Sequence, residues 1–382
     1  MKEPGSISLA MIVRNEARYL PGCLESVRGI VDEIVIVDTG STDGTPEMAA
    51  ELGARVYSFP WNDDFAGARN ESLSHCRCEW ILVLDADERL AAGQKEPVRQ
   101  CARARGAVAH TLLVKGTATL PAGPSTQVMP FERLFRNVPG IRFEGTVHEQ
   151  VASSIRRMGG VVSPSSIVIE HLGYAQGPEA LERKAERNRR LLLARLAKSP
   201  NDAYACYHMG NMAAMFQQYE DARSYLRRAL AADGLPPPLR AVSWALLAEI
   251  ALRMGRLVEA AGCCRSSLAL APRQMAARWY LVGTFVQTKD YTAACACLRE
   301  ILQMFFEGAP PAALDVSVDV YVDEWRVRLI TGQCLWKIGD TSSALRSFEA
   351  ALRLNPQSQE ILSNLALARR SVPMAASGSR PV

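Results

Sequence analysis

Apolar and polar residues alternate in short blocks over the first third of the chain. Four apolar runs have the length of buried strands, at residues 7–13, 33–37, 54–58 and 80–84. Between them apolar residues recur every three or four positions, and Thr45 with Pro46 predicts a helix that ends at Gly53. Near-continuous apolar strands separated by helices predict an α/β domain with a mostly parallel sheet that is covered on both faces.

The pattern becomes less regular between residues 107 and 166, where apolar runs alternate with prolines. We interpret this segment as the second half of the same domain, which we place at residues 1–177. Pro178 then opens a long, charged helical segment. This segment, residues 178–200, is predicted to be a helical linker that leaves the domain.

The remainder of the chain is repetitive. Small and aromatic residues recur at fixed offsets in two sets, which are Trp244, Leu247, Ala248, Ala251, Ala260, Cys264 and Pro272, and Arg328, Thr331, Gly332, Leu335, Ala344, Phe348 and Pro356. A further copy in residues 206–229 fits the same pattern, and one in residues 279–298 fits it with a slip of one residue. It is the pattern of the tetratricopeptide repeat, a helical pair of about 34 residues. We therefore predict an all-α tetratricopeptide solenoid at residues 201–371 and a disordered tail at residues 372–382.

Composition and charge give no indication of a nucleic-acid-binding, membrane-spanning or secreted protein. The chain has 382 residues and a net charge of +4, which is too small to indicate nucleic-acid binding on its own. No apolar stretch approaches the ~20 residues of a membrane-spanning helix, and the first residues lack a convincing signal peptide. The ten cysteines have no CxxC spacing, so we interpret them as reduced, mostly buried thiols. A cytoplasmic protein is expected.

Acidic side chains follow two of the predicted strands directly. Asp85 and Asp87 follow the run at 80–84, and Asp38 follows the run at 33–37. A carboxylate at the tip of a buried strand is costly unless a cation or hydrogen bonds satisfy it. Open α/β sheets bind ligands at such strand ends, and Mg²⁺ and Mn²⁺ prefer carboxylate and phosphate oxygens. Asp85 and Asp87 are therefore predicted to hold a divalent cation bound to a nucleotide diphosphate.

Two more side chains are placed at the same cleft. Asp38 is predicted to bind a ribose or a nucleobase, although it could instead hold the turn that follows it. Arg69 begins a helix under the cleft, from which an arginine could reach a pyrimidine edge or a phosphate.

Four segments carry a resemblance to a known family. They are MIVRNEARYLPGCLESV, VDEIVIVDTGSTDGT, FAGARNESL and WILVLDADER. Together they resemble the family 2 inverting glycosyltransferases of GT-A fold, which is Rossmann-like. Later segments around Arg133, Glu149 and His171 resemble two branches of that family. One is the lipopolysaccharide-core glucosyltransferases. The other is the bacterial glycosyltransferases with tetratricopeptide tails, which include peptide S-glycosyltransferases. The likeness covers about residues 5–200.

The resemblance implies roles for the matching residues. Glu16 and Asp38 would contact the nucleoside, and Arg69 would support the nucleotide. Asp85 and Asp87 would hold Mg²⁺ or Mn²⁺ together with the diphosphate of a nucleotide sugar, and a uridine diphosphate sugar is the expected donor.

An inverting transfer also needs a base that deprotonates the acceptor opposite the leaving group. Glu149 is predicted to be this base, and His148 beside it is predicted to contact the metal, the phosphate or the acceptor. Adjacent residues of a strand point to opposite faces, so both cannot easily line one cleft. If His148 faces the metal, Glu149 would have a structural role.

Other polar residues are weaker candidates. His171 follows an apolar run, where a lone histidine is more often structural. Arg133 and Arg136 could grip the diphosphate or could equally be solvated. The basic run at residues 183–190 is interleaved with glutamates, which favours a solvated helix face.

The leading interpretation is an enzyme that transfers a hexose from a nucleotide diphosphate sugar. The repeat domain would recruit the acceptor, because solenoids offer concave surfaces for extended peptides. A peptide or protein is modestly favoured over a cell-envelope glycan, and repeat edges could mediate a homodimer. One alternative is a tetratricopeptide adaptor that has lost catalysis and binds nucleotide or protein partners. Another is a nucleotidyltransferase, which the absence of glycine from residues 9–16 disfavours.

Overall fold

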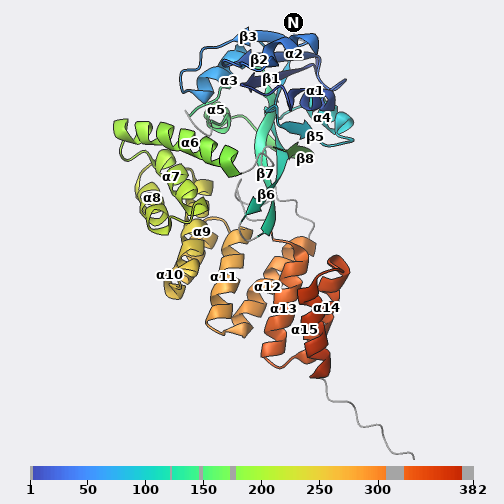
Figure 1. Ribbon diagram of the computed structural model, residues 1–382, viewed down its shortest axis with the longest axis vertical. Coiled ribbons are helices and arrows are strands. Elements are labelled where there is room, and N and C mark those ends of the chain that lie inside the picture. Colours follow the sequence, from blue (N-terminus) through green and yellow to red (C-terminus); the bar gives the residue numbers. More distant parts are fainter. Residues whose placement is uncertain (1–2, 121–122, 146–148, 173–177, 307–321, 372–382) are drawn as a thin grey trace, which may run out of the picture. The chain divides into compact units, whose positions relative to one another are not determined.

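The computed structural model describes residues 3–120, 123–145, 149–172, 178–306 and 322–371 (Figure 1). The chain divides into two compact units, and the boundary between them lies at Ala205 and Cys206. In these described ranges, no helix combines the length and the apolar composition needed to cross a membrane.

Among the described residues of the first unit, an eight-stranded sheet has the order β3-β2-β1-β4-β7-β6-β8-β5. The strands are β1 (Ile7–Val13), β2 (Glu33–Asp38), β3 (Arg55–Ser58), β4 (Trp80–Val83), β5 (Glu88–Leu90), β6 (Ala109–Leu120), β7 (Gly123–Arg136) and β8 (Val162–His171). β1 to β4 pair in parallel, whereas β7 is antiparallel to β4 and β6. The predicted α/β fold is confirmed, with a sheet that is mixed because its second half contains antiparallel pairs.

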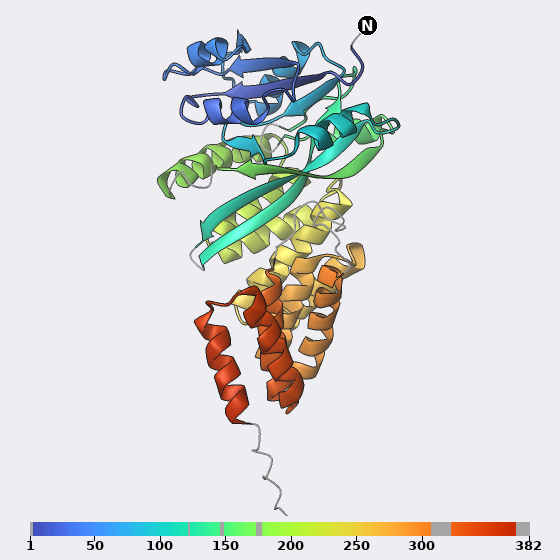
Figure 2. The ribbon, with the colours of Figure 1, turned by 90° about the vertical axis from the view of Figure 1, so that its right-hand side faces the viewer.

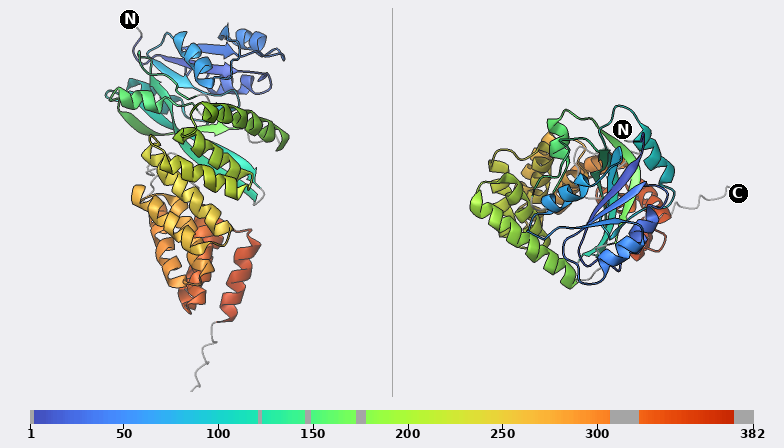
Figure 3. Two further views of the ribbon diagram at one scale, coloured as in Figure 1. Left: turned by 90° about the vertical axis from the view of Figure 1, so that its left-hand side faces the viewer. Right: turned by 90° about the horizontal axis from the view of Figure 1, so that it is seen from above.

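Helices cover both faces of this sheet, as Figures 2 and 3 show. The helices of this unit are α1 (Leu20–Ser26), α2 (Thr45–Glu51), α3 (Phe65–Ser74), α4 (Lys95–Arg103), α5 (Ala152–Arg157) and α6 (Pro178–Lys198). Successive residues of a strand point to opposite faces, so Leu9 and Met11 join one apolar core and Ala10 joins the other. Burial on both sides explains why these strands are unbroken apolar runs in the sequence.

The carboxyl ends of β1 and β2 lie at the same edge of the sheet. Val13 of β1 is the register partner of Asp38 of β2. The loops that follow the two strands are joined, because the N–H of Glu16 donates to Thr45 Oγ1 at 2.9 Å. This bond holds the loop that carries Glu16 against the start of α2.

The second unit consists of paired helices. They are α7 (Ala203–Met215), α8 (Tyr219–Ala231), α9 (Pro237–Arg253), α10 (Leu257–Leu270), α11 (Met275–Gln287), α12 (Tyr291–Phe306), α13 (Glu324–Lys337), α14 (Thr341–Leu354) and α15 (Gln359–Arg370). The helices of a pair approach closely at the predicted small positions. A Cβ at Gly332 would lie 2.5 Å from the ring of Phe348, and one at Gly210 would lie 2.7 Å from Leu226. The predicted solenoid is confirmed, and the predicted tail at residues 372–382 lies outside the described residues.

Candidate active site

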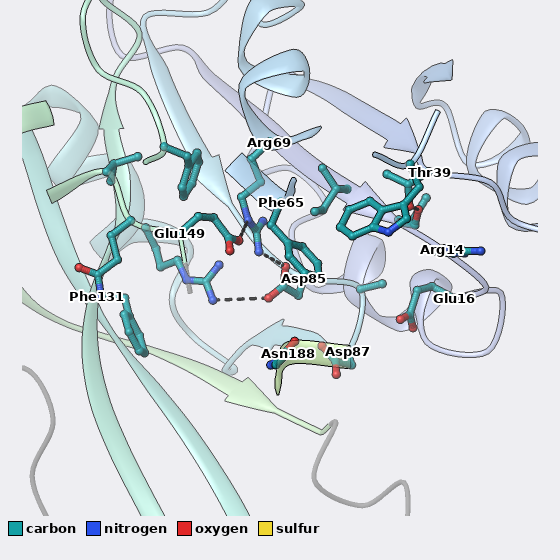
Figure 4. A pocket seen from close by; sticks show the side chains of 18 of the residues that line it. Arg14, Glu16, Thr39, Phe65, Arg69, Asp85, Asp87, Phe131, Glu149 and Asn188 are labelled. Carbon is teal, nitrogen blue, oxygen red and sulfur yellow. Dashed lines mark hydrogen bonds and ion pairs between the residues drawn. The ribbon is translucent and has the colours of Figure 1, made fainter. Parts of the chain in front are cut away.

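A cavity of about 380 Å³ opens in the first unit where β1 and β4 end (Figure 4). Its walls come from the loops after β1 to β4, from α3 and β7, from the segment around Glu149, and from α6. The predicted site residues that line it are Glu16, Arg69, Asp85, Asp87 and Glu149. The fold therefore brings together side chains that are far apart in the sequence.

Arg69, which belongs to α3, joins two carboxylates of the cavity wall. Its Nε donates to Glu149 Oε1 at 2.5 Å, and its Nη2 donates to Asp85 Oδ1 at 2.7 Å (Figure 4). The side chains of Arg69 and Glu149 are each 10% exposed. Burial alone would lower the pKa of Arg69, but the charges of Asp85 and Glu149 outweigh it and raise the pKa. The guanidinium is thus a permanent cation inside the cavity wall.

The other terminal nitrogen of Arg69 has a different environment. Nη1 is buried and has no hydrogen-bond partner among the residues that the structure describes. Leaving a buried donor unpaired costs about 1–3 kcal/mol, and such groups are rare in native structures. Because Arg69 lines the cavity, an acceptor oxygen of a ligand is the natural partner for this nitrogen.

A second network surrounds Glu88, which the sequence analysis did not select as a site residue. Glu88 Oε2 accepts the N–H of Asp85 at 2.9 Å, and Oε1 accepts from Arg133 Nη2 at 2.8 Å. The same Arg133 nitrogen lies 3.6 Å from Asp85 Oδ2. Burial raises the pKa of Glu88, and the charge of Arg133 acts in the opposite direction. The turn from Asp85 to Glu88 is therefore tied to β7.

Asp87, on the cavity wall, pairs with His171. His171 Nε2 lies 3.3 Å from Asp87 Oδ2, because β8 pairs with β5 in a register that places His171 opposite Glu88. In the described part of the chain, no three His, Cys, Asp or Glu side chains form a group that could hold a metal ion. Mg²⁺ is usually bound by one or two carboxylates plus substrate phosphates. Asp87 beside His171 therefore fits a cation that arrives with a diphosphate, whereas Asp85 is already paired with Arg69.

Two of the predicted site residues, Asp38 and His148, are not found on the described wall of the cavity. Asp38 is buried at the end of β2 and is not among the described residues that line the cavity. Its carboxylate accepts the N–H groups of Gly40 at 3.0 Å and Ser41 at 3.1 Å, the turn contacts of the alternative interpretation. The neighbouring Thr39 lines the cavity. The nucleoside role of Asp38 stays a prediction, and His148 lies outside the described residues.

Arg133 and Arg136 lie on β7, where residues three apart point to opposite faces. Arg133 lines the cavity. Arg136 instead forms an ion pair with Glu79, and its guanidinium lies 4.5 Å from the ring centroid of Trp80. The structure thus separates two arginines that the sequence analysis treated alike.

The α6 helix forms a wall of the cavity that the sequence pattern did not indicate. Arg187 lines the cavity, and its guanidinium lies 4.8 Å from the ring centroid of Phe65. Arg190 binds Asp63 through two bonds of 2.9 and 2.8 Å, and Asp63 accepts the indole N–H of Trp61. Arg187 and Arg190 are exposed, as the predicted solvated face implies, but both also contact residues of the loop after β3 and the start of α3. Their partners lie more than 120 residues earlier, at a separation of 127 for the ion pair, so helix periodicity carries no signal for them.

This geometry defines a class of protein, namely an α/β domain with carboxylates and arginines around a cavity at its strand ends, followed by helical repeats. Residues 8–152 match the glycosyl transferase family 2 model, and residues 207–274 and 317–371 match a tetratricopeptide repeat model. The chain contains a glycosyl transferase family 2 domain followed by tetratricopeptide repeats.

Several curated proteins are similar to this chain. A TPR repeat-containing protein of Synechococcus elongatus is 38% identical over 252 residues, which cover 64% of this chain and 61% of that protein. The SPbeta prophage-derived glycosyltransferase SunS of Bacillus subtilis is 24% identical over 231 residues, which cover 59% of this chain and 53% of that protein. The chain thus spans between half and two thirds of the length of these relatives. A crystal structure of MamA protein has a TM-score of 0.38 at 13% identity and covers 52% of this chain and 92% of that one.

Proposed function

We propose that this protein is a glycosyltransferase that moves a hexose, with inversion, from a nucleotide diphosphate sugar to an acceptor recruited by its repeat unit. The observation that carries the proposal is Arg69. It is a buried cation that binds Asp85 and Glu149, and its Nη1 has no hydrogen-bond partner among the described residues. The family 2 domain supports the same reaction class.

The donor is proposed to bind along the strand ends, with its diphosphate near Arg69 and Arg133. Both side chains line the cavity, and the fork of a guanidinium matches phosphate oxygens. Glu16 is proposed to contact the nucleoside. Asp38 can still receive a ribose hydroxyl beside its two backbone donors, because a carboxylate has about four acceptor sites.

A divalent cation is proposed to accompany the donor because of the charge balance of the cavity. The described lining contains five carboxylates, those of Glu16, Asp85, Asp87, Glu132 and Glu149, against four arginines, Arg14, Arg69, Arg133 and Arg187. A bare diphosphate would therefore meet no excess of positive charge. Asp87 would hold Mg²⁺ or Mn²⁺, with His171 beside it. The bound cation would take up the charge that develops on the leaving diphosphate.

Glu149 is proposed to be the catalytic base. Arg69 fixes the orientation of its carboxylate on the cavity wall. The carboxylate would take the proton of the acceptor as the acceptor atom bonds to the anomeric carbon. The nucleoside diphosphate would leave from the opposite face with the electrons of the broken bond.

The repeat unit is proposed to hold the acceptor. Stacked helical pairs form extended concave surfaces that suit a chain-like ligand. A peptide or protein segment is therefore favoured over a cell-envelope glycan.

The test is hydrolysis of UDP-glucose in the presence of Mn²⁺ by wild type and by Asp87→Asn. We expect the variant to lose activity by about two orders of magnitude, as when a group that stabilises transition-state charge is removed. Chelation with EDTA should have the same effect on wild type. Asp233→Asn, at an exposed position of the repeat unit, is the control and should retain full activity.

Two outcomes would contradict the proposal. Full activity in EDTA would remove the role of the cation. Nucleotide-sugar binding without turnover, measured by calorimetry over a panel of donors and acceptor extracts, would favour the adaptor alternative.

A further inference from the structure

We propose that Glu88 is a positioning residue that holds Arg133 in place to bind the diphosphate of the donor. The inference rests on the proposed function and deepens it, because it assigns the diphosphate contact to one arginine and the orientation of that arginine to one buried acid. Glu88 is not among the described residues that line the cavity, but it binds Asp85 and Arg133, which do line it, so it acts through these two neighbours.

Both oxygens of the Glu88 carboxylate already have partners. Oε2 accepts the N–H of Asp85 and thereby closes the turn that carries both aspartates. Oε1 accepts from Nη2 of Arg133, at 2.8 Å. The Glu88 side chain is only 2% exposed, and a carboxylate so deeply buried is kept in a folded protein only when it is paired. The Glu88 carboxylate is therefore stabilised by its ion pair with Arg133 and not by solvent.

Arg133 is held on two sides and still faces the cavity. Its guanidinium lies 5.8 Å from the ring centroid of Phe131, which lines the cavity as well. Glu88 and Asp85 both engage Nη2 in the described structure. A guanidinium has five N–H donors in a planar fork. The remaining donors are fixed in direction by these contacts and suit two oxygens of a diphosphate.

The chain offers a matched comparison in Glu79 and Arg136. Arg136 is on the same strand as Arg133, and Glu79 pairs with it in the same way. Neither residue is among the described residues that line the cavity. A Glu→Gln change at position 79 thus removes the same kind of ion pair from the same strand without touching the donor site.

The substitution Glu88→Gln separates the two bonds of Glu88. A glutamine oxygen can still accept the N–H of Asp85, but its amide group cannot accept a bond from Arg133. Loss of a charge-assisted hydrogen bond weakens binding by about tenfold or more. We therefore expect Glu88→Gln to weaken the affinity for UDP with Mn²⁺, measured by calorimetry, by about tenfold. KM for UDP-glucose should rise similarly, with a smaller change in kcat, because uniform binding is lost.

The double variant decides whether Glu88 acts through Arg133. In an Arg133→Met background, Glu88→Gln should change the affinity for UDP by less than about twofold, since the group that it positions is gone. Glu79→Gln should leave the affinity for UDP within about twofold of wild type.

Three results would overturn the inference. One is an equal loss from Glu88→Gln in wild type and in Arg133→Met. Another is an equal effect of Glu79→Gln and Glu88→Gln. If Glu88→Gln does not fold, as judged by circular dichroism, Arg133→Lys replaces it, and unchanged UDP affinity in that variant has the same meaning. A wild-type protein that binds no nucleoside diphosphate and hydrolyses no sugar donor would instead overturn the proposed function itself.

Discussion

Arg69 joins two carboxylates of the cavity wall, so one guanidinium sets the position of both. Its Nε donates to Glu149 at 2.5 Å, and its Nη2 donates to Asp85 at 2.7 Å. A ligand oxygen bound to the buried Nη1 would contact the same planar group. We therefore expect donor binding and the position of the Glu149 carboxylate to be coupled through Arg69.

His110 provides a pH-dependent contribution to the stability of the first unit. It is 5% exposed, and its ring centroid lies 5.5 Å from that of Trp80. Burial lowers the pKa of His110, and the charge of Arg136 lowers it further. In the unfolded chain the pKa returns to about 6.5, so the unfolded state binds a proton first as the pH falls. The free energy of unfolding should therefore decrease below about pH 6.5.

Urea unfolding at pH 7.5 and pH 5.5 tests this expectation. His110→Gln removes the titrating group, so the midpoint for the first unit should fall less on acidification than in wild type. An identical fall in both proteins would show that His110 does not contribute.

Sequence reasoning found those site residues whose signal is local. Asp85 and Asp87 follow an apolar run, and Arg69 lies at a helix start near the same edge, so strand-end logic was sufficient to place them. Glu88 and His171 could not be paired with their partners in this way. Glu88 binds Arg133, which lies 45 residues later on β7. His171 reaches Asp87 because β5 meets β8 in one particular register, and register is set by tertiary packing.

At the scale of elements, the strands and helices with a regular apolar pattern could be predicted from the sequence, and those without one could not. The strands β1 and β4 and most of β2 are buried, whereas β3 is partly exposed. Apolar runs in the sequence mark all four strands within a residue or two. β6 and β7 form a long antiparallel pair with a register shift between His110 and Thr111. Such irregularity leaves no simple alternation in the sequence. The repeat helices were recognised because their small residues occur where helices touch.

Because small residues are needed only where two helices touch, replacing glycine by alanine should have opposite effects on stability at Gly332 and Gly262. A Cβ at Gly332 would lie 2.5 Å from the ring of Phe348, which is fully buried. Overpacking costs about 1–3 kcal/mol, which exceeds the gain of up to about 1 kcal/mol from replacing glycine within a helix. Gly332→Ala should therefore lower the free energy of unfolding of the repeat unit.

Gly262, within α10, serves as the control because a Cβ there would meet nothing within 4 Å. Gly262→Ala should raise the free energy of unfolding by up to about 1 kcal/mol. Denaturant titration of both variants measures the difference. A stabilised Gly332→Ala would show that the contact with Phe348 is not tight.

At the scale of the whole molecule, two compact units can respond to a ligand separately. The proposed donor site lies entirely within the first unit. UDP with Mn²⁺ should therefore raise the melting temperature of that unit and leave the repeat unit unchanged. At a concentration of 100 times Kd, binding contributes about 2.7 kcal/mol.

Scanning calorimetry of the full chain, with UDP in Mn²⁺ and then in EDTA, checks this prediction. The transition that Gly332→Ala displaces identifies the repeat unit. EDTA should abolish the shift of the other transition. Equal displacement of both transitions by UDP would contradict the assignment of the site to the first unit.

The ion pair of Asp63 with Arg190 has a consequence for the order of events during biosynthesis. The ribosome makes the loop around Asp63 well before the helix that holds it, since the pair spans 127 positions. A nascent chain that stops short of Pro178 would already contain every strand of the sheet but would lack the basic flank of its pocket. Donor binding should therefore be acquired late in translation. A chain truncated before Pro178 should bind the donor more weakly, because Arg187 and its part of the cavity wall are missing.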